Sequence, residues 1–140
     1  LRLAGELHLP VVIHSRDAAM DTIEIMKAAH AEEIGGVIHC FSYTKETAEV
    51  FLKMGFYIGI GGVVTFKNAK KLKEAVEFIP MERLVVETDS PYLAPEPYRG
   101  KRNDSAKLPL IINEIARIKQ LLPREIEKIT WENAHALYRM

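Results

Sequence analysis

Four short apolar runs recur along this chain of 140 residues, and they constrain its fold more than any other feature. Each run is rich in valine and isoleucine, and most of its length lacks alternation between apolar and polar residues. Continuous apolarity is typical of parallel strands that are buried on both faces of a sheet. The runs, which we predict to be strands, are residues 10–14, 36–41, 56–60 and 84–89.

Segments with a helical spacing of apolar residues separate the runs. Alternation of strand and helix indicates a parallel α/β fold. The strand–helix units are about 20–30 residues long, which is typical of a TIM barrel, whose eight units need about 250 residues. The apolar stripes are Ala19, Ile23, Met26 and Ala29, then Ala48, Phe51 and Leu52, then Leu72, Val76 and Ile79, and in the tail Ile111, Ile115, Ile118 and Leu122. After the tail stripe we expect a short helix from Pro123 and a last one capped by Thr130.

Four such units are half of what a closed barrel needs. An open half leaves two strand edges unpaired, which soluble proteins normally avoid. The pattern alone is compatible with an open doubly wound sheet and with a piece of a larger barrel. Because the chain opens at Leu1 in helix-like sequence without an initiator methionine, we expect that more chain precedes it.

Charge and composition exclude some classes of protein. Nineteen basic and 19 acidic side chains cancel, whereas a nucleic-acid coat or a membrane-surface protein would be clearly basic. No apolar run approaches the roughly 18 residues of a spanning helix, so we expect no membrane partner. The single cysteine, Cys40, cannot form an internal disulfide, and no signal-like segment starts the sequence. We therefore expect a cytoplasmic protein.

Polar residues follow each predicted strand. His14 ends the first and His39 the second, a glycine-rich stretch at 59–62 follows the third, and Glu87 and Asp89 end the fourth. The carboxyl ends of parallel strands converge on one face, where catalytic groups lie. Two imidazoles and a carboxylate there predict a site for zinc or another transition metal. Glu87 and Asp89 are two residues apart, so within a strand they point to the same side.

A purely structural role is the simpler interpretation of these polar residues. A single histidine at a strand end is more often a hydrogen-bonded structural residue than a ligand, but three matching polar endings on one face favour a site. The other histidines lack this context, and Cys40, which points away from its neighbour His39, reads as a small core residue. The glycines at 59–62 do not form a dinucleotide fingerprint and indicate a tight loop with close backbone approach. The histidines expected to have no function are His8, His30 and His135.

The segment from Pro91 to Asn103 is a long loop, stiffened by three prolines, that carries basic and aromatic side chains. By itself it could be an ordinary solvated loop. Directly after the carboxylate strand, however, it must overhang the predicted site, where loops usually bind substrate. Cations beside aromatic rings suit a phosphodiester backbone and a stacked base. These residues are Tyr92, Tyr98, Arg99, Lys101 and Arg102.

Together these motifs resemble the TatD family of metal-dependent DNases, which belongs to the amidohydrolase-like TIM barrels. The resemblance implies a distorted TIM barrel with two divalent metal ions, whether Mg, Mn or Zn. It also implies that residues 1–140 are the C-terminal part of a single TatD-like domain, a half barrel containing the last four βα units. The matching motifs are residues 10–17, 39–42, 59–62, 87–95 and 98–103, with Asn133-Ala134 near the end.

The same resemblance implies roles for individual residues. The metal ligands are His14 and His39 for one ion and Asp89 for the other, and Asp89 is also the catalytic base. Glu87 orients a ligand from behind. The family's remaining ligands, a His-x-His pair and a bridging acid, have no counterpart here. The residues implied to bind substrate are Arg16, Tyr92, Arg99, Lys101 and Arg102, with Tyr98 as the alternative to Tyr92.

Two positions depart from the family pattern. Tyr43 stands where glycine is usual, which predicts a tighter site entrance. The segment 104–106 stands where Glu-Pro is usual, which changes only the shape of the loop.

The function implied is hydrolysis of phosphodiester bonds in DNA, by trimming single-stranded ends. We expect the chain on its own to be inactive and to self-associate through its open edge. Two alternatives remain at this point: a hydrolase of the same barrel type acting on a C–N or ester bond, and a half barrel without catalytic activity.

Overall fold

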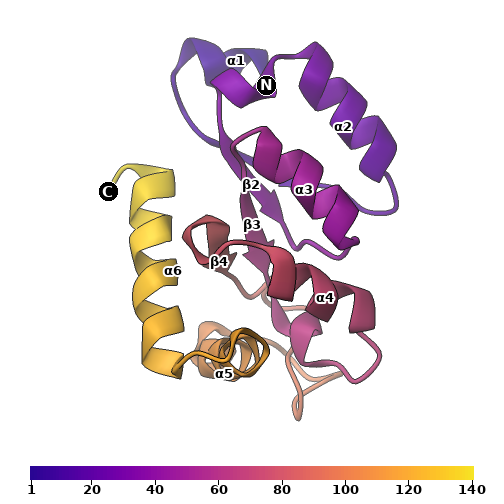
Figure 1. The fold of residues 1–140 in the computed structure, drawn as a ribbon, viewed down its shortest axis with the longest axis vertical. Helices are drawn as coiled ribbons and strands as arrows, with labels where there is room; N and C mark the ends of the chain where they lie inside the picture. Colours follow the sequence, from indigo (N-terminus) through magenta and orange to yellow (C-terminus); the bar gives the residue numbers. More distant parts are fainter.

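Four parallel strands form one sheet in the computed structural model, which describes residues 1–140 (Figure 1). The strands lie in chain order, β1-β2-β3-β4, and every neighbouring pair is parallel. They are β1 (Val11–His14), β2 (Gly36–His39), β3 (Tyr57–Ile60) and β4 (Leu84–Val86). This order is that of consecutive strands in a barrel wall, and the sheet is a half barrel with β1 and β4 at its open edges.

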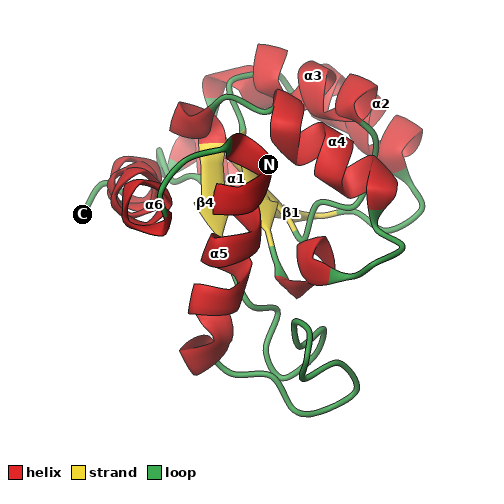
Figure 2. Ribbon diagram, turned by 60° about the horizontal axis from the view of Figure 1, so that its bottom comes forward, coloured by secondary structure: helices red, strands yellow, loops and turns green.

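Helices cover the strands and connect them. The helices α2, α3 and α4 lie together on one side of the sheet, and α5 and α6 lie beside β4 (Figure 2). None of the helices is both long enough and apolar enough to cross a membrane. The helices are α1 (Arg2–Glu6), α2 (Ala19–Ala28), α3 (Lys45–Lys53), α4 (Lys70–Phe78), α5 (Leu108–Lys119) and α6 (Pro123–Tyr138), with 3-10 turns η1 (Ala31–Glu33), η2 (Gly62–Thr65), η3 (Met81–Arg83) and η4 (Ser105–Lys107).

The two faces of the sheet bury different sets of side chains. On the outer face Ile38, Ile58 and Leu84 join the main core with the helices. On the inner face Val37 and Val85 pack with Leu137 of α6 in a smaller cluster. Successive residues of a strand point to opposite faces, so His39, two residues after Val37, belongs to the inner face. The site is therefore built on the inner side of the half barrel.

Burial on both faces, the basis of the strand prediction, is confirmed for three strands and wrong for one. Strands β2, β3 and β4 are mostly buried throughout, whereas β1 alternates between partly buried and exposed residues. Val12 is 57% exposed. The reason is that β1 is an edge strand whose inner face no other element covers.

The fourth strand is shorter than predicted. It ends at Val86, so Glu87 and Asp89 lie beyond it, and Asp89 has a φ of 57°. The argument that both side chains share a face because they alternate within a strand is therefore wrong for Asp89. The turn that follows β4 nevertheless places the Asp89 carboxylate, like that of Glu87, against the ring of His39.

The two predicted C-terminal helices are one. Thr130 does not cap a new helix, because its hydroxyl donates to the carbonyl of Ile126, 2.8 Å away, within α6. Asn133, one turn later, donates to the carbonyls of Met81 and Leu84 at 2.7 and 2.8 Å and so fixes α6 to β4.

An ion-pair cluster links α4 to α5, and we expect it to make stability depend on pH. Glu114 accepts hydrogen bonds from Arg117 and from Lys73, with N–O distances of 2.8 and 2.7 Å, and these partners lower its pKa from 4.5 to about 2. Because the folded pKa is depressed, the stabilisation is present above pH 4.5 and is lost as pH falls through about 2. Glu114→Gln should lower the free energy of unfolding by about 1–2 kcal/mol at pH 7 after allowance for solvent screening.

Chemical denaturation at pH 7 and at stepwise lower pH tests this. The difference between the variant and the original chain should shrink below pH 4.5. Glu49→Gln is the control, since the pair of Glu49 with Lys53 is exposed and should contribute little. A Glu114→Gln effect that is independent of pH would contradict the assignment.

Candidate active site

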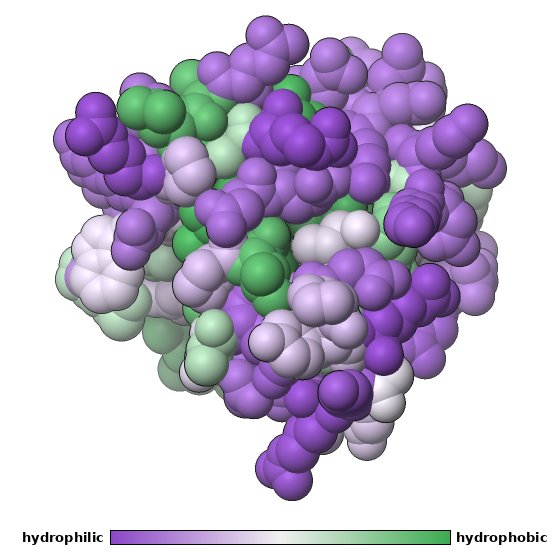
Figure 3. Space-filling model, turned by 90° about the horizontal axis from the view of Figure 1, so that it is seen from below, coloured by the Kyte–Doolittle hydropathy of each residue, from purple (hydrophilic) through white to green (hydrophobic).

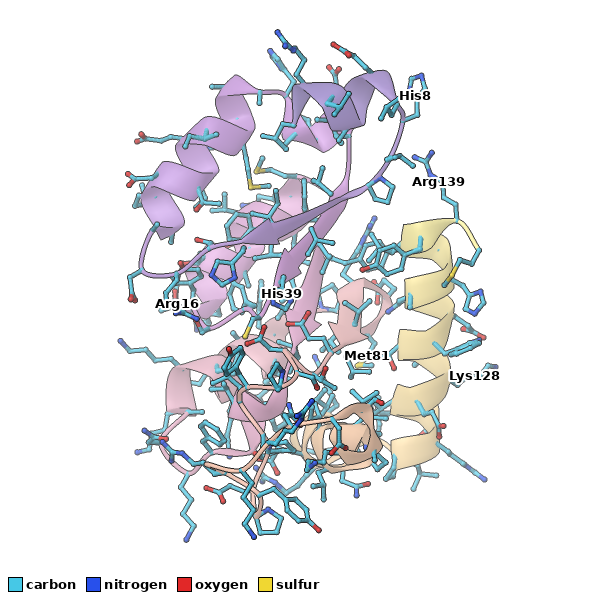
Figure 4. All side chains as sticks on the ribbon, turned by 180° about the vertical axis from the view of Figure 1, so that it is seen from behind. His8, Arg16, His39, Met81, Lys128 and Arg139 are labelled. Carbon is cyan, nitrogen blue, oxygen red and sulfur yellow. The ribbon has the colours of Figure 1, made fainter.

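His39 lies between two carboxylates at the carboxyl end of β2 (Figure 4). Its Nδ1 is 2.7 Å from Oε2 of Glu87, and its Nε2 is 3.0 Å from Oδ1 of Asp89. The backbone N–H of Cys40 donates to the second oxygen of Glu87. Both oxygens of Glu87 are thus used to hold the end of β2, which fixes the orientation of the His39 ring.

Glycine at position 59 makes room for this arrangement. Gly59 lies within β3, and a Cβ there would be 2.7 Å from Oε2 of Glu87. Three residues later, just after β3, Gly62 allows a close backbone approach, because a Cβ there would be 2.2 Å from the carbonyl oxygen of Leu93. The prediction of close approach is confirmed for Gly62, whereas Gly59 accommodates a side chain and not a backbone.

The carboxylates change the proton affinities around them. Burial lowers the pKa of His39, but hydrogen bonds and charges from Glu87 and Asp89 outweigh it, and the pKa is raised above 6.5. Burial raises the pKa of Glu87 even though His39 opposes the change. Burial, and then the charges of Glu87 and Asp89, raise the pKa of the Cys40 thiol to about 11. A thiol that stays protonated is a poor nucleophile. Cys40 is only half-buried and borders the site, so the prediction that it is a core residue is wrong.

His14 lies beside His39 but is less constrained. The register pairs His14 with His39 across β1 and β2, and their ring centroids are 5.9 Å apart. His14 is exposed and makes no side-chain hydrogen bond. Of the predicted metal ligands, the structure thus places His39 against Asp89, with Glu87 on the other side of the His39 ring and His14 on the neighbouring strand.

These donors fit part of a divalent-metal site. A ligating histidine usually holds its other ring nitrogen on a carboxylate, as Glu87 does for Nδ1 of His39. The remaining nitrogen, Nε2, lies 3.0 Å from Oδ1 of Asp89, so a second donor of the kind that binds divalent metals faces it. No three His, Cys, Asp or Glu side chains are grouped so that they could hold an ion by themselves. The chain therefore presents a partial set of ligands.

Arg16, predicted to bind substrate, is exposed on the loop after β1 (Figure 4). It is close enough to Cys40 for its charge to lower the pKa of that thiol, against the larger effects that raise it. Tyr43, the departure from the family pattern that predicted a tighter site entrance, holds this loop. Its hydroxyl is 2.7 Å from Oγ of buried Ser15 and accepts from the N–H of Ala18 at 3.2 Å. Tyr43 thus ties the first loop to the second.

The segment from Pro91 to Asn103, which we call the basic loop, lines a cavity of about 530 Å³. Its wall includes a residue that the sequence did not single out, Phe66 of the segment after β3, and the Arg99 guanidinium lies 4.3 Å from the centroid of that ring. Tyr98 is not in the wall and faces Lys107, 5.5 Å from its ring centroid. Four of the five predicted substrate-binding residues line this cavity: Tyr92, Arg99, Lys101 and Arg102. Arg16 is the exception.

Asn103 closes the loop at its base. Its buried side chain donates to the carbonyls of Thr88 and Tyr92, at 2.7 and 2.8 Å, and its backbone N–H donates to Pro91. The sequence showed Asn103 only as the last residue of a motif. These contacts hold the base of the loop to the segment from Thr88 to Tyr92, which contains Asp89.

The histidines expected to have no function lie apart from the site. His8 follows α1, and its carbonyl accepts from Arg139, which Figure 4 shows beside it. His30 follows α2, and the ring of His135 lies 4.5 Å from that of Trp131. Their lack of a role remains a prediction.

Comparison with known proteins gives consistent matches. The family model described as TatD related DNase matches residues 1–139. The chain is 48% identical over 140 residues to the uncharacterized metal-dependent hydrolase YabD of Bacillus subtilis, covering 100% of this chain and 55% of that protein. It is 37% identical over 145 residues to a protein named 3'-5' ssDNA/RNA exonuclease TatD from Rahnella, again covering 100% of this chain and 55% of that protein.

Among solved structures, the TatD homologue YJJV of Escherichia coli superposes with a TM-score of 0.92 at 27% identity, covering 99% of this chain and 53% of that one. The half-barrel fold predicted from the sequence is confirmed. The chain spans about half the length of the relatives it matches.

Proposed function

Because this chain belongs to the TatD-related DNase family of metal-dependent hydrolases, we propose that it acts in the hydrolysis of phosphodiester bonds at the ends of single-stranded DNA. One observation carries the proposal: the loop that carries Tyr92, Arg99 and Lys101 into the cavity wall begins directly after Asp89, which lies 3.0 Å from His39, and the base of the loop is tied back to Thr88. Cations and an aromatic ring suit a nucleotide, and the cluster suits a divalent metal. The name of the Rahnella relative supports a nucleic-acid substrate.

We assign the residues as follows. His14 and His39 would hold one divalent ion and Asp89 a second, and the ions would polarise a phosphoryl oxygen and lower the pKa of an attacking water. Glu87 keeps Nδ1 of His39 occupied, so that Nε2 is the ligating atom. The Asp89 carboxylate would accept the proton of the water. Phosphate oxygens would be held by Arg16, Arg99, Lys101 and Arg102, and Tyr92 would stack on a base.

The ligands in this chain are three of the six that the family resemblance implies. We propose that residues 1–140 are the C-terminal part of a barrel domain and that the other ligands come from outside them. The chain by itself should then hydrolyse DNA poorly and should associate through the unpaired edge of β1, where Val12 is exposed. We also propose that it acts in the cytoplasm.

A chimera tests the function. Residues 1–140 replace the matching part of the Rahnella exonuclease, and release of nucleotides from single-stranded DNA is measured with Mg²⁺ or Mn²⁺. We expect metal-dependent activity that falls by roughly 10²–10⁴-fold in Asp89→Asn, because the proton acceptor is lost. Asp21→Asn, which changes an exposed carboxylate of α2, is the matched control.

Other outcomes distinguish the alternatives. A folded, metal-binding chimera that leaves DNA intact but hydrolyses amides or esters would favour a C–N or ester hydrolase. A folded chimera that binds no metal would favour a half barrel without catalytic activity. Strong activity of the 140-residue chain alone, lost in Asp89→Asn, would contradict the need for ligands from outside it.

A further inference from the structure

A basic surface continues from the cavity along the segment that follows β3. Phe66 lies in the cavity wall under the Arg99 guanidinium, and Lys67 is the next residue. Lys70 and Lys71 then begin α4. We call Lys67, Lys70 and Lys71 the lysine ridge; all three are exposed. Figure 3 looks onto this end of the molecule, the lower end of Figure 1, where hydrophilic side chains surround a few exposed apolar groups.

The cations of the ridge have no partners within the chain. None of the three takes part in a salt bridge, whereas the next lysine along α4, Lys73, is paired with Glu114. Arg99, Lys101 and Arg102 in the cavity are also unpaired. No acidic residue occurs from 50 to 73, and the nearest acids in sequence to the ridge and the cavity are Glu74, Asp89, Glu96 and Asp104. In a chain with no net charge, positive charge is thus concentrated here.

The position of two ridge lysines at the start of α4 makes the electrostatic potential there more positive. Lys70 and Lys71 occupy the first turn of α4, which contains no acidic residue and no side-chain cap. The first turn of a helix carries partial positive charge from free N–H groups, and cations are unfavourable there. An anion bound at the ridge would interact favourably with the lysines and with the helix end.

We propose that the lysine ridge binds the backbone phosphates of a nucleic-acid strand beyond the nucleotide that occupies the cavity. This inference rests on the proposed function, because it assumes that the cavity holds one end of that strand. Regularly repeated phosphates suit a row of unpaired cations, and such contacts do not depend on sequence. The ridge would therefore add affinity only for strands long enough to reach it.

Binding of single-stranded DNA of different lengths tests the proposal. Fluorescence anisotropy is measured in EDTA, to prevent hydrolysis, with oligonucleotides of three and fifteen nucleotides over a series of salt concentrations. In Lys67→Gln/Lys70→Gln/Lys71→Gln we expect the affinity for the fifteen-mer to fall by about 10–100-fold. The slope of its salt dependence should decrease by about 2, since each phosphate contact contributes about 0.7 for a single strand. Affinity for the three-mer should stay unchanged.

The matched control is Lys27→Gln/Lys53→Gln/Lys128→Gln, which removes the same charge from α2, α3 and α6. Equal losses of affinity for the fifteen-mer in the two triple variants would overturn the proposed role of the ridge, because the change in net charge would explain them. A fifteen-mer slope unchanged in the ridge variant would overturn the ridge alone and leave the proposed function standing. Absence of binding to both oligonucleotides by the original chain would overturn the nucleic-acid substrate as well.

Discussion

Gly36→Ala is expected to lower the free energy of unfolding by more than about 3 kcal/mol or to prevent folding, an effect in the range reserved for severe steric or backbone conflicts. Gly36 begins β2 with a φ of 152°, and it pairs with Val11 across the first two strands. A Cβ at this position would be 2.1 Å from the carbonyl oxygen of Val11 and 2.8 Å from its nitrogen. The atoms in conflict are backbone, so neither can move without breaking the pairing of β1 with β2.

The neighbouring glycine provides the control. Gly35 also has a positive φ, 74°, but a Cβ there would meet nothing within 4 Å. Gly35→Ala should therefore cost only about 1 kcal/mol from backbone strain. Unfolding of both variants by urea, followed by circular dichroism, measures the difference. A similar decrease in the free energy of unfolding in the two variants would show that the close approach of β2 to β1 is not the reason for glycine at position 36.

The sequence predicted the architecture because the side chains of the outer core form patterns within short stretches of the chain. Continuous runs such as Ile38 with its neighbours mark a strand wherever both faces are covered, and helical stripes mark the helices between them. The prediction was wrong for β1 because one face of this edge strand is not covered by any other element, and a run of apolar residues does not show whether both faces of a strand are covered. It was also wrong for α6, where Thr130 satisfies its hydroxyl inside the helix, an outcome that composition does not distinguish from capping.

The candidate site was predicted in part for the same reason. Residues at strand ends, such as His39 and Asp89, can be placed from chain order, because parallel strands end on one face. Tyr43, Phe66 and Asn103 act through contacts between separate loops, and no periodic pattern reports such contacts. Phe66 had one usable signal, an aromatic residue four positions before the lysine-rich start of α4.

Metal binding should depend most strongly on His39. We expect the 140-residue chain to bind at most one divalent ion, because its histidines and carboxylates do not form a complete site. His39→Ala should abolish measurable binding of Zn²⁺ or Mn²⁺ in calorimetry, since it removes the one imidazole held by carboxylates on both ring nitrogens. His30→Asn is the control, because His30 lies outside the site and asparagine tolerates its positive φ.

Glu87→Gln separates orientation from ligation in the same measurement. The Glu87 carboxylate touches His39 and the N–H of Cys40, so it would act on the ion only through the ring it holds. Loss of such a partner typically weakens metal binding by about 10–100-fold, and we expect a loss in that range, with circular dichroism unchanged. Asp89→Asn should leave binding at the histidines largely intact, since Asp89 is assigned to the other ion. If instead Glu87→Gln abolishes binding as fully as His39→Ala, Glu87 is a ligand and the arrangement proposed for the site is wrong.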